Sequence, residues 1–112
     1  MLLMIGTNDT KSPTPVDVYR DNLRQIILSA KANGMTPIVA TLPELEFSPY
    51  YQANRQYVDI YSDEVRSLSR KLNFLTCDMS GMGRHLVDGV HFGNAGYTEI
   101  ARRFSDKILG LK

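Results

Sequence analysis

The sequence predicts an α/β fold with a parallel sheet, because three short apolar runs alternate with three long amphipathic segments. The apolar runs are residues 2–5, 37–42 and 74–79, and the helical segments span about 15–33, 53–72 and 94–109. Strands that alternate with helices predict right-handed crossovers and helices on the faces of the sheet. In such sheets the functional site lies at the carboxyl ends of the strands.

The first apolar run is continuous and closes at Gly6, which favours a strand buried on both faces. Gly6 to Thr10 is then predicted as a turn. Thr14 is predicted to cap the first helix, with Pro15 in the first helical position. Helical spacing places an apolar stripe on its inner face: Tyr19, Leu23, Ile26, Ile27 and Ala30.

The second strand ends at Pro43, and residues 44–52 form an aromatic loop with Phe47, Tyr50 and Tyr51. This loop is predicted either to pack over the core or to contact a substrate. The second helix has a longer apolar stripe: Tyr57, Ile60, Tyr61, Val65, Leu68 and Leu72.

The third strand contains Cys77, which is predicted to be a buried packing thiol. Asn94 is a predicted N-cap for the last helix. The apolar positions of that helix repeat at helical spacing and predict its inner face: Tyr97, Ile100, Ala101, Phe104 and Ile108.

Composition limits the kinds of partner. The 112 residues predict a single domain over 1–112, and a net charge of +1 gives no electrostatic attraction to nucleic acid or anionic membranes. No apolar run approaches the ~20 residues needed to span a bilayer. The single cysteine excludes an internal disulfide, and no signal in the sequence indicates a compartment.

The loop before the last helix contains Asp88 and His91, three residues apart. A carboxylate at this spacing can hold one imidazole nitrogen while the other accepts a proton from a hydroxyl, which is the base half of a hydrolytic triad. Gly6, Thr7, Asn8 and Asp9 follow the first strand, so both segments are predicted at the same edge of the sheet. Either motif alone is equally typical of a turn.

Together, Gly6-x-Asn8-Asp9, Asp88-x-x-His91 and Asn94-x-Gly96-Tyr97 resemble conserved blocks of the SGNH, or GDSL-type, serine hydrolases. The resemblance covers nearly the whole chain. It implies a flavodoxin-like, three-layer α/β/α fold, here truncated to three parallel strands and three main helices. It also implies hydrolysis of carboxylic or acetyl esters.

The resemblance assigns roles to five residues. Asn8 would donate its side-chain amide to the developing oxyanion, Gly6 would provide a tight backbone beside it, and Asp9 would support the turn. His91 would be the general base and then the general acid, oriented by Asp88. Position 92 is Phe where the family commonly has Pro, which predicts a less rigid turn at His91.

The nucleophile of the family is missing, because no Gly-Asp-Ser block occurs in the chain. Ser12 and Ser80 are the only serines in loops at the predicted catalytic edge, and neither has the expected setting. We therefore expect a C-terminal portion of a hydrolase, inactive as an isolated chain, whose substrate would be a small ester or an acetylated carbohydrate. The alternative is a non-catalytic, oligomerising remnant of the fold.

The missing segment would lie beside residues 2–5, so this strand is predicted to be an open edge. Such an edge predicts a homodimer or a domain-swapped oligomer, or pairing with a separate N-terminal fragment.

No cofactor is predicted, because the chain has no glycine-rich phosphate loop. No metal is predicted either. His85, Asp88 and His91 are possible zinc ligands, but their spacing does not converge in an irregular loop and no fourth ligand is nearby.

Overall fold

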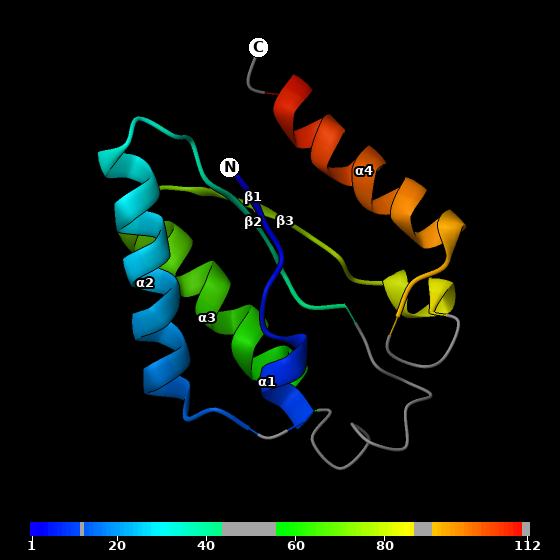
Figure 1. The fold of residues 1–112 in the computed structure, drawn as a ribbon, viewed down its shortest axis with the longest axis horizontal. Helices are drawn as coiled ribbons and strands as arrows, with labels where there is room; N and C mark the ends of the chain where they lie inside the picture. The colour runs from blue at the N-terminus through cyan, green and yellow to red at the C-terminus, as the bar shows by residue number, and fades with distance from the viewer. Residues whose placement is uncertain (12, 44–55, 87–90, 111–112) are drawn as a thin grey trace.

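The computed structural model describes residues 1–11, 13–43, 56–86 and 91–110, and within them confirms the predicted parallel sheet (Figure 1). Its strand order is β1-β2-β3, and both strand pairs are parallel. The elements in chain order are β1 (Leu2–Leu3), α1 (Thr7–Lys11), α2 (Val16–Ala32), β2 (Ile38–Ala40), α3 (Gln56–Leu72), β3 (Leu75–Cys77), the 3-10 helix η2 (Met82–His85) and α4 (Asn94–Leu109).

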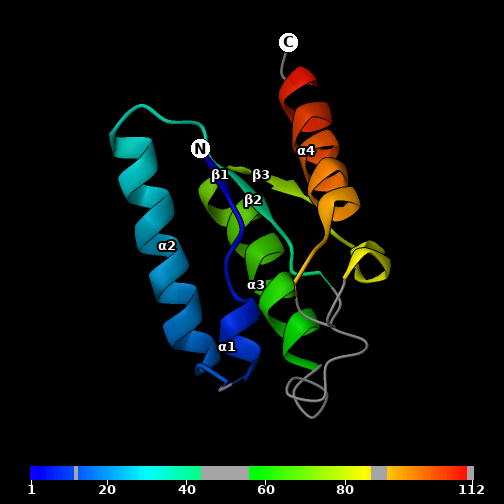
Figure 2. The ribbon, with the colours of Figure 1, turned by 45° about the vertical axis from the view of Figure 1, so that its right-hand side comes forward.

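The sheet separates two apolar cores, because alternate residues of β2 point to opposite faces. Val39 packs in the core shared with α2 and α3, and that core is formed by Tyr19, Leu23, Ile27, Val39, Leu42, Val58, Tyr61, Val65, Leu68 and Phe74. Ile38 and Ala40 point to the other face, where α4 lies (Figure 2). That smaller core also contains Cys77, Met79, Met82 and Phe104.

The face that α4 covers is incompletely buried at β1. Leu2 pairs with Ile38 and therefore lies on the α4 face, whereas Leu3 pairs with Val39 and packs against the larger core. Helix α4 packs on β3 and η2, and Leu2 and Met4 remain 51% and 38% exposed. The predicted burial of this strand on both faces is therefore wrong for its α4 face in this chain.

Three local predictions differ from the structure. Residues Thr7–Lys11 form a short helix rather than a turn, and the Thr10 hydroxyl donates to the Thr7 carbonyl (2.6 Å). Pro15, not Thr14, is the N-cap of α2, and the Thr14 hydroxyl donates to the Asp9 carboxylate (2.5 Å). Gly93, not Asn94, is the N-cap of α4.

The strands are shorter than predicted, and side-chain acceptors take part in the hydrogen bonding beyond their carboxyl ends. Beyond β2, the Met79 N–H donates to the Thr41 hydroxyl oxygen (2.9 Å), and the Leu42 N–H donates to the Ser62 hydroxyl oxygen (2.9 Å). The chain thus leaves the sheet at the edge where the site was expected.

The predicted inner faces are mostly correct for α2 and α3 and only partly correct for α4. Tyr19, Leu23, Ile27 and Ala30 are buried, whereas Ile26 is 36% exposed because it lies beside this stripe. On α4, Phe104 is buried and Ile100 is half-buried as predicted, but the prediction is wrong for Ala101, which is exposed, and for Tyr97 and Ile108, which are 58% and 40% exposed. Cys77 is buried as predicted, and burial raises the pKa of its thiol. The aromatic loop with Phe47, Tyr50 and Tyr51 lies outside the described residues.

Candidate active site

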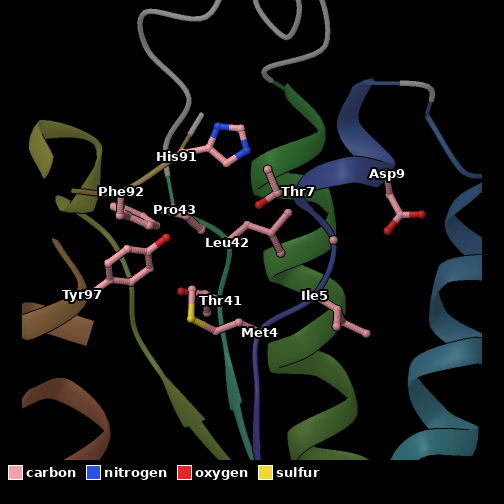
Figure 3. A pocket seen from close by; sticks show the side chains of 11 residues that line it. Met4, Ile5, Thr7, Asp9, Thr41, Leu42, Pro43, His91, Phe92 and Tyr97 are labelled. Carbon is pink, nitrogen blue, oxygen red and sulfur yellow. The ribbon is translucent and has the colours of Figure 1, made fainter. Parts of the chain in front are cut away.

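A cavity of about 470 Å³ lies at the carboxyl ends of β1 and β2 (Figure 3). It brings the segment after β1 together with His91, as expected for two loops at one edge of a parallel sheet. Its lining residues are Met4, Ile5, Gly6, Thr7, Asp9, Thr41, Leu42, Pro43, His91, Phe92 and Tyr97. The side chains of His91 and Thr7 both border the space (Figure 3).

Gly6 occupies a backbone conformation that side chains rarely adopt, with φ of +122°. A Cβ built there would lie 3.1 Å from the Tyr19 hydroxyl oxygen and 3.1 Å from Leu42 Cδ2. The backbone conformation therefore favours glycine, and an added side chain would also crowd Tyr19 and Leu42. This restricted backbone lies at the start of the first motif, directly before Thr7.

Asp9 is held by hydrogen bonds that also close the connection to α2. Its carboxylate accepts the Thr14 hydroxyl, and its backbone carbonyl accepts the Thr14 N–H (3.3 Å). The Tyr61 hydroxyl from α3 reaches the carbonyls of Thr14 (2.7 Å) and Asp9 (3.3 Å). The segment after β1 is thus held by hydrogen bonds from Tyr61, a residue of the larger core.

The side of the cavity that carries His91 is held by close packing. Phe92 forms an isolated antiparallel bridge with Leu86, and its ring meets that of Tyr97 edge-on, with 6.4 Å between centroids. A Cβ at Gly96 would lie 2.8 Å from Phe92 Cβ and 3.0 Å from His85 Cβ. Gly96 therefore allows α4 to approach Phe92, which fixes the backbone next to His91.

A second set of contacts fixes the start of the same loop, directly after β3. The Arg103 guanidinium donates to the carbonyls of Asp78 (3.1 Å) and Ser80 (2.7 Å), and its Nε donates to Glu99 (3.0 Å). Hydrogen bonds from Arg102 and then from Arg103 lower the pKa of Glu99 to about 2. The Ser80 backbone N–H is the main cause of the lowered pKa of Asp78.

The structure tests the remaining predicted site residues only in part. The side chain of Asn8, together with Asp88 and Ser12, lies outside what the structure describes. Ser80 donates to the Asp78 carboxylate (2.9 Å) and lines a different cavity, beside β3 and α4. Among the described residues that line the cavity with His91 there is no serine.

His85 packs near Gly96 and does not line the cavity. The described residues contain no group of three His, Cys, Asp or Glu side chains arranged to hold a metal. Within the same residues, no helix has the length and apolar character needed to cross a bilayer.

Sequence reasoning missed the site contributions of Tyr19, Tyr61 and Thr41. The two tyrosines were predicted only as inner-face residues, because helical periodicity reports burial and not the direction of a hydroxyl. Thr41 is 3% exposed and accepts the Met79 N–H, yet its position at the end of an apolar run gives no sign of this bond.

The model of the GDSL-like lipase/acylhydrolase family matches residues 1–98. The chain belongs to this family. No curated protein matches the chain in sequence.

Two solved structures have a similar fold. A GDSL-like lipase from Bacteroides thetaiotaomicron superimposes with a TM-score of 0.80 and 18% identity, over 99% of this chain and 62% of its own. A catalytic mutant of an acetylxylan esterase from Geobacillus stearothermophilus gives a TM-score of 0.79 and 24% identity, over 96% of this chain and 57% of its own. This GDSL-like chain thus has a flavodoxin-like α/β fold and spans about three fifths of either neighbour's length.

Proposed function

We propose that this chain carries the oxyanion donor and the general base of an enzyme that hydrolyses carboxylic esters. The observation that carries the proposal is the shared cavity: Gly6, Thr7 and Asp9 of one motif line it together with His91 of the other. Membership of the GDSL-like family supports the same chemistry.

In the proposed reaction a serine hydroxyl attacks the ester carbonyl carbon while His91 accepts its proton. Asn8 donates its side-chain N–H to the oxyanion, and one such donor is typically worth about 3 kcal/mol of the barrier. Asp88 orients His91 and stabilises the imidazolium. The alcohol leaves with the proton from His91, and water then hydrolyses the acyl-enzyme by the same steps.

We propose that the nucleophile comes from a segment that this sequence does not contain. Two observations support this: the sequence has no Gly-Asp-Ser block, and the similar structures are longer than this chain. On this proposal the isolated chain is inactive, although it contains the residues proposed as oxyanion donor and general base.

The proposed substrate is a small ester or an acetylated carbohydrate. The cavity supports this by combining apolar side chains from Met4, Leu42 and Pro43 with the polar side chain of Thr7. The acetylxylan esterase among the similar structures supports an acetyl group as the acyl part.

The test is hydrolysis of a small activated acetate ester by this chain, by His91→Ala and by His85→Ala as the matched control. We expect no turnover by the isolated chain. After fusion to a family member's N-terminal segment with the Gly-Asp-Ser block, we expect turnover that is lost in His91→Ala and kept in His85→Ala. A fusion that folds but acts equally well with His91→Ala would contradict the proposal. Turnover by the isolated chain that depends on His91 would place the nucleophile within it, and Ser12 and Ser80 would be replaced next.

A second candidate is a non-catalytic, oligomerising remnant, and the exposure of Leu2 and Met4 beside the edge of β1 favours assembly in either case. Among the described strands, β1 pairs with β2 alone. We propose that the 2–5 edge pairs with a second copy in a homodimer, directly or through an exchanged segment.

Molar mass from light scattering tests this assembly. We expect a dimer that dissociates in Leu2→Asp and persists in Leu28→Asp, a control on α2 where the side chain is 40% exposed. A monomeric parent chain, or equal dissociation in both variants, would overturn the proposed edge.

A further inference from the structure

Two tyrosine hydroxyls reach the backbone on either side of Asn8. Tyr19 of α2 donates to the Ile5 carbonyl (3.3 Å), which precedes Gly6. Tyr61 of α3 directs its hydroxyl at the carbonyls of Thr14 (2.7 Å) and Asp9 (3.3 Å). A phenol has one proton, so the shorter contact to Thr14 is its principal hydrogen bond and Asp9 shares it.

These hydroxyls have fixed positions because their rings belong to the core. Tyr19 and Tyr61 are 3% and 0% exposed, and their rings stack with 4.3 Å between centroids and 28° between planes. Burial, followed by the charge of Asp9, raises the pKa of both phenols. Both groups therefore remain hydrogen-bond donors well above neutral pH.

Tyr61, Thr14 and Asp9 are linked in a ring of hydrogen bonds at the end of the first motif. Tyr61 bonds to the Thr14 carbonyl, and the Thr14 hydroxyl in turn donates to the Asp9 carboxylate. On the other side of the motif, the Tyr19 hydroxyl lies where a side chain at Gly6 would have to go. Phenylalanine would fill the core equally well, so the hydroxyls contribute something that packing does not require.

We propose that Tyr19 and Tyr61 are positioning residues that hold the segment from Gly6 to Asp9 in the geometry from which Asn8 donates to the oxyanion. This inference rests on the role of Asn8 in the proposed function. It extends the site to the faces of α2 and α3, which do not border the substrate.

The experiment measures order rather than turnover, so it does not depend on finding hydrolysis. Backbone ¹⁵N order parameters would be compared between the parent chain and Tyr61→Phe, with Tyr57→Phe as the control on the same helix. In Tyr61→Phe we expect the order parameters of the amides of residues 7–10 to fall from about 0.85 toward about 0.6. The order parameters of residues 58–65 should stay unchanged. Tyr57→Phe should leave both groups at the parent values.

An unchanged 7–10 segment in Tyr61→Phe would overturn the inference. An equal fall in 58–65 would also overturn it, because a core residue with no positioning role loosens its own helix as well. Thr14→Val opens the same ring at the Asp9 carboxylate while leaving Tyr61 in place, and it should give the same local loss even if Tyr61→Phe fails to fold. In the active fusion described above, Tyr61→Phe should lower kcat about tenfold and leave KM unchanged.

Discussion

The two sides of the cavity are held in different ways. The segment after β1 is held from below by hydrogen bonds from buried side chains, with Tyr19 and Tyr61 reaching backbone carbonyls. The segment that carries His91 is held from the side, by the packing of Phe92 against Gly96 and by Arg103 bonds to the loop after β3. The first side depends on the large core of α2 and α3, and the second depends mainly on α4 and on the Leu86–Phe92 bridge.

This difference indicates which side tolerates change. Carbonyls fixed by buried phenols leave little freedom, because displacing them would leave polar groups unpaired in the core. The α4 side borders a face where Leu2 and Met4 are exposed, so it has fewer neighbours to resist movement. We therefore expect substitutions beside Gly6 to cost more stability than equivalent substitutions beside His91.

Gly6→Ala should have the largest effect, lowering the free energy of unfolding by about 3 kcal/mol, because backbone strain and crowding add. The matched control is Gly34→Ala, where φ is +75° and nothing lies within 4 Å of the added Cβ. Gly34→Ala reports backbone strain alone and should cost about 1 kcal/mol. Urea unfolding measures both, and equal losses would show that crowding at Gly6 is negligible.

Gly96→Ala should cost about 2 kcal/mol, because its Cβ must displace Phe92 or His85. Gly110→Ala is the control, since its neighbours stand at ordinary contact distances of 3.4 Å and more. The His91 ring resonances in NMR spectra should shift in Gly96→Ala and not in Gly110→Ala. Unmoved His91 signals in a destabilised Gly96→Ala would show that Phe92 does not position the histidine.

Thr41→Val should cost about 1–2 kcal/mol, because the buried Met79 N–H loses its acceptor. In Thr41→Val, hydrogen exchange at the Met79 amide should be faster than in the parent chain, while exchange in α2 should change less. The control is Thr98→Val on α4, whose exposed hydroxyl donates only locally to the Asn94 carbonyl (3.0 Å). Similar losses of stability in both variants would show that the Thr41–Met79 hydrogen bond contributes no more than an exposed one.

The smallest effect concerns acid stability and compares Glu99 on the α4 side with Glu64 on the α2–α3 side. The pKa of Glu99 is about 2, below its ordinary 4.5, and the Arg20 hydrogen bond lowers the pKa of Glu64. A lowered carboxyl pKa stabilises the folded state above about pH 4.5, and this stabilisation is lost as the pH falls toward 2. The stability difference between the parent chain and Glu99→Gln should therefore shrink across this window, with a smaller change for Glu64→Gln.

Urea midpoints between pH 6 and pH 2.5 would check the acid effect at fixed ionic strength. A difference for Glu99→Gln that stays constant across this range would mean that its bonds to Arg102 and Arg103 contribute nothing measurable. Surface ion pairs are commonly weak, so this prediction comes last.

Much of the fold follows from patterns in the sequence. Apolar runs bounded by Gly and Pro predict the strands, and stripes such as Tyr19, Leu23 and Ile27 predict which helix face is buried. The pairing of the first motif with His91 was also predictable, because parallel strands end at one edge of the sheet.

The local errors share one cause. Residues 7–11 resemble a turn because Asn and Asp favour turns, yet they form α1 where Tyr61 anchors the Asp9 carbonyl. Thr14 resembles an N-cap, but its hydroxyl bonds to the Asp9 carboxylate. In both places a residue far along the chain, or a carboxylate across a turn, outweighs the local preference.

The sequence by itself therefore determined the order of the elements, the parallel sheet and the edge where the two motifs meet, since these depend on periodicity and chain direction. Only the tertiary structure decided which buried hydroxyls hold that edge, why Gly96 must lack a side chain, and which apolar residues stay exposed. Those properties depend on distances between α2, α3 and α4. Periodicity places a residue on a helix face, but it does not specify what lies opposite.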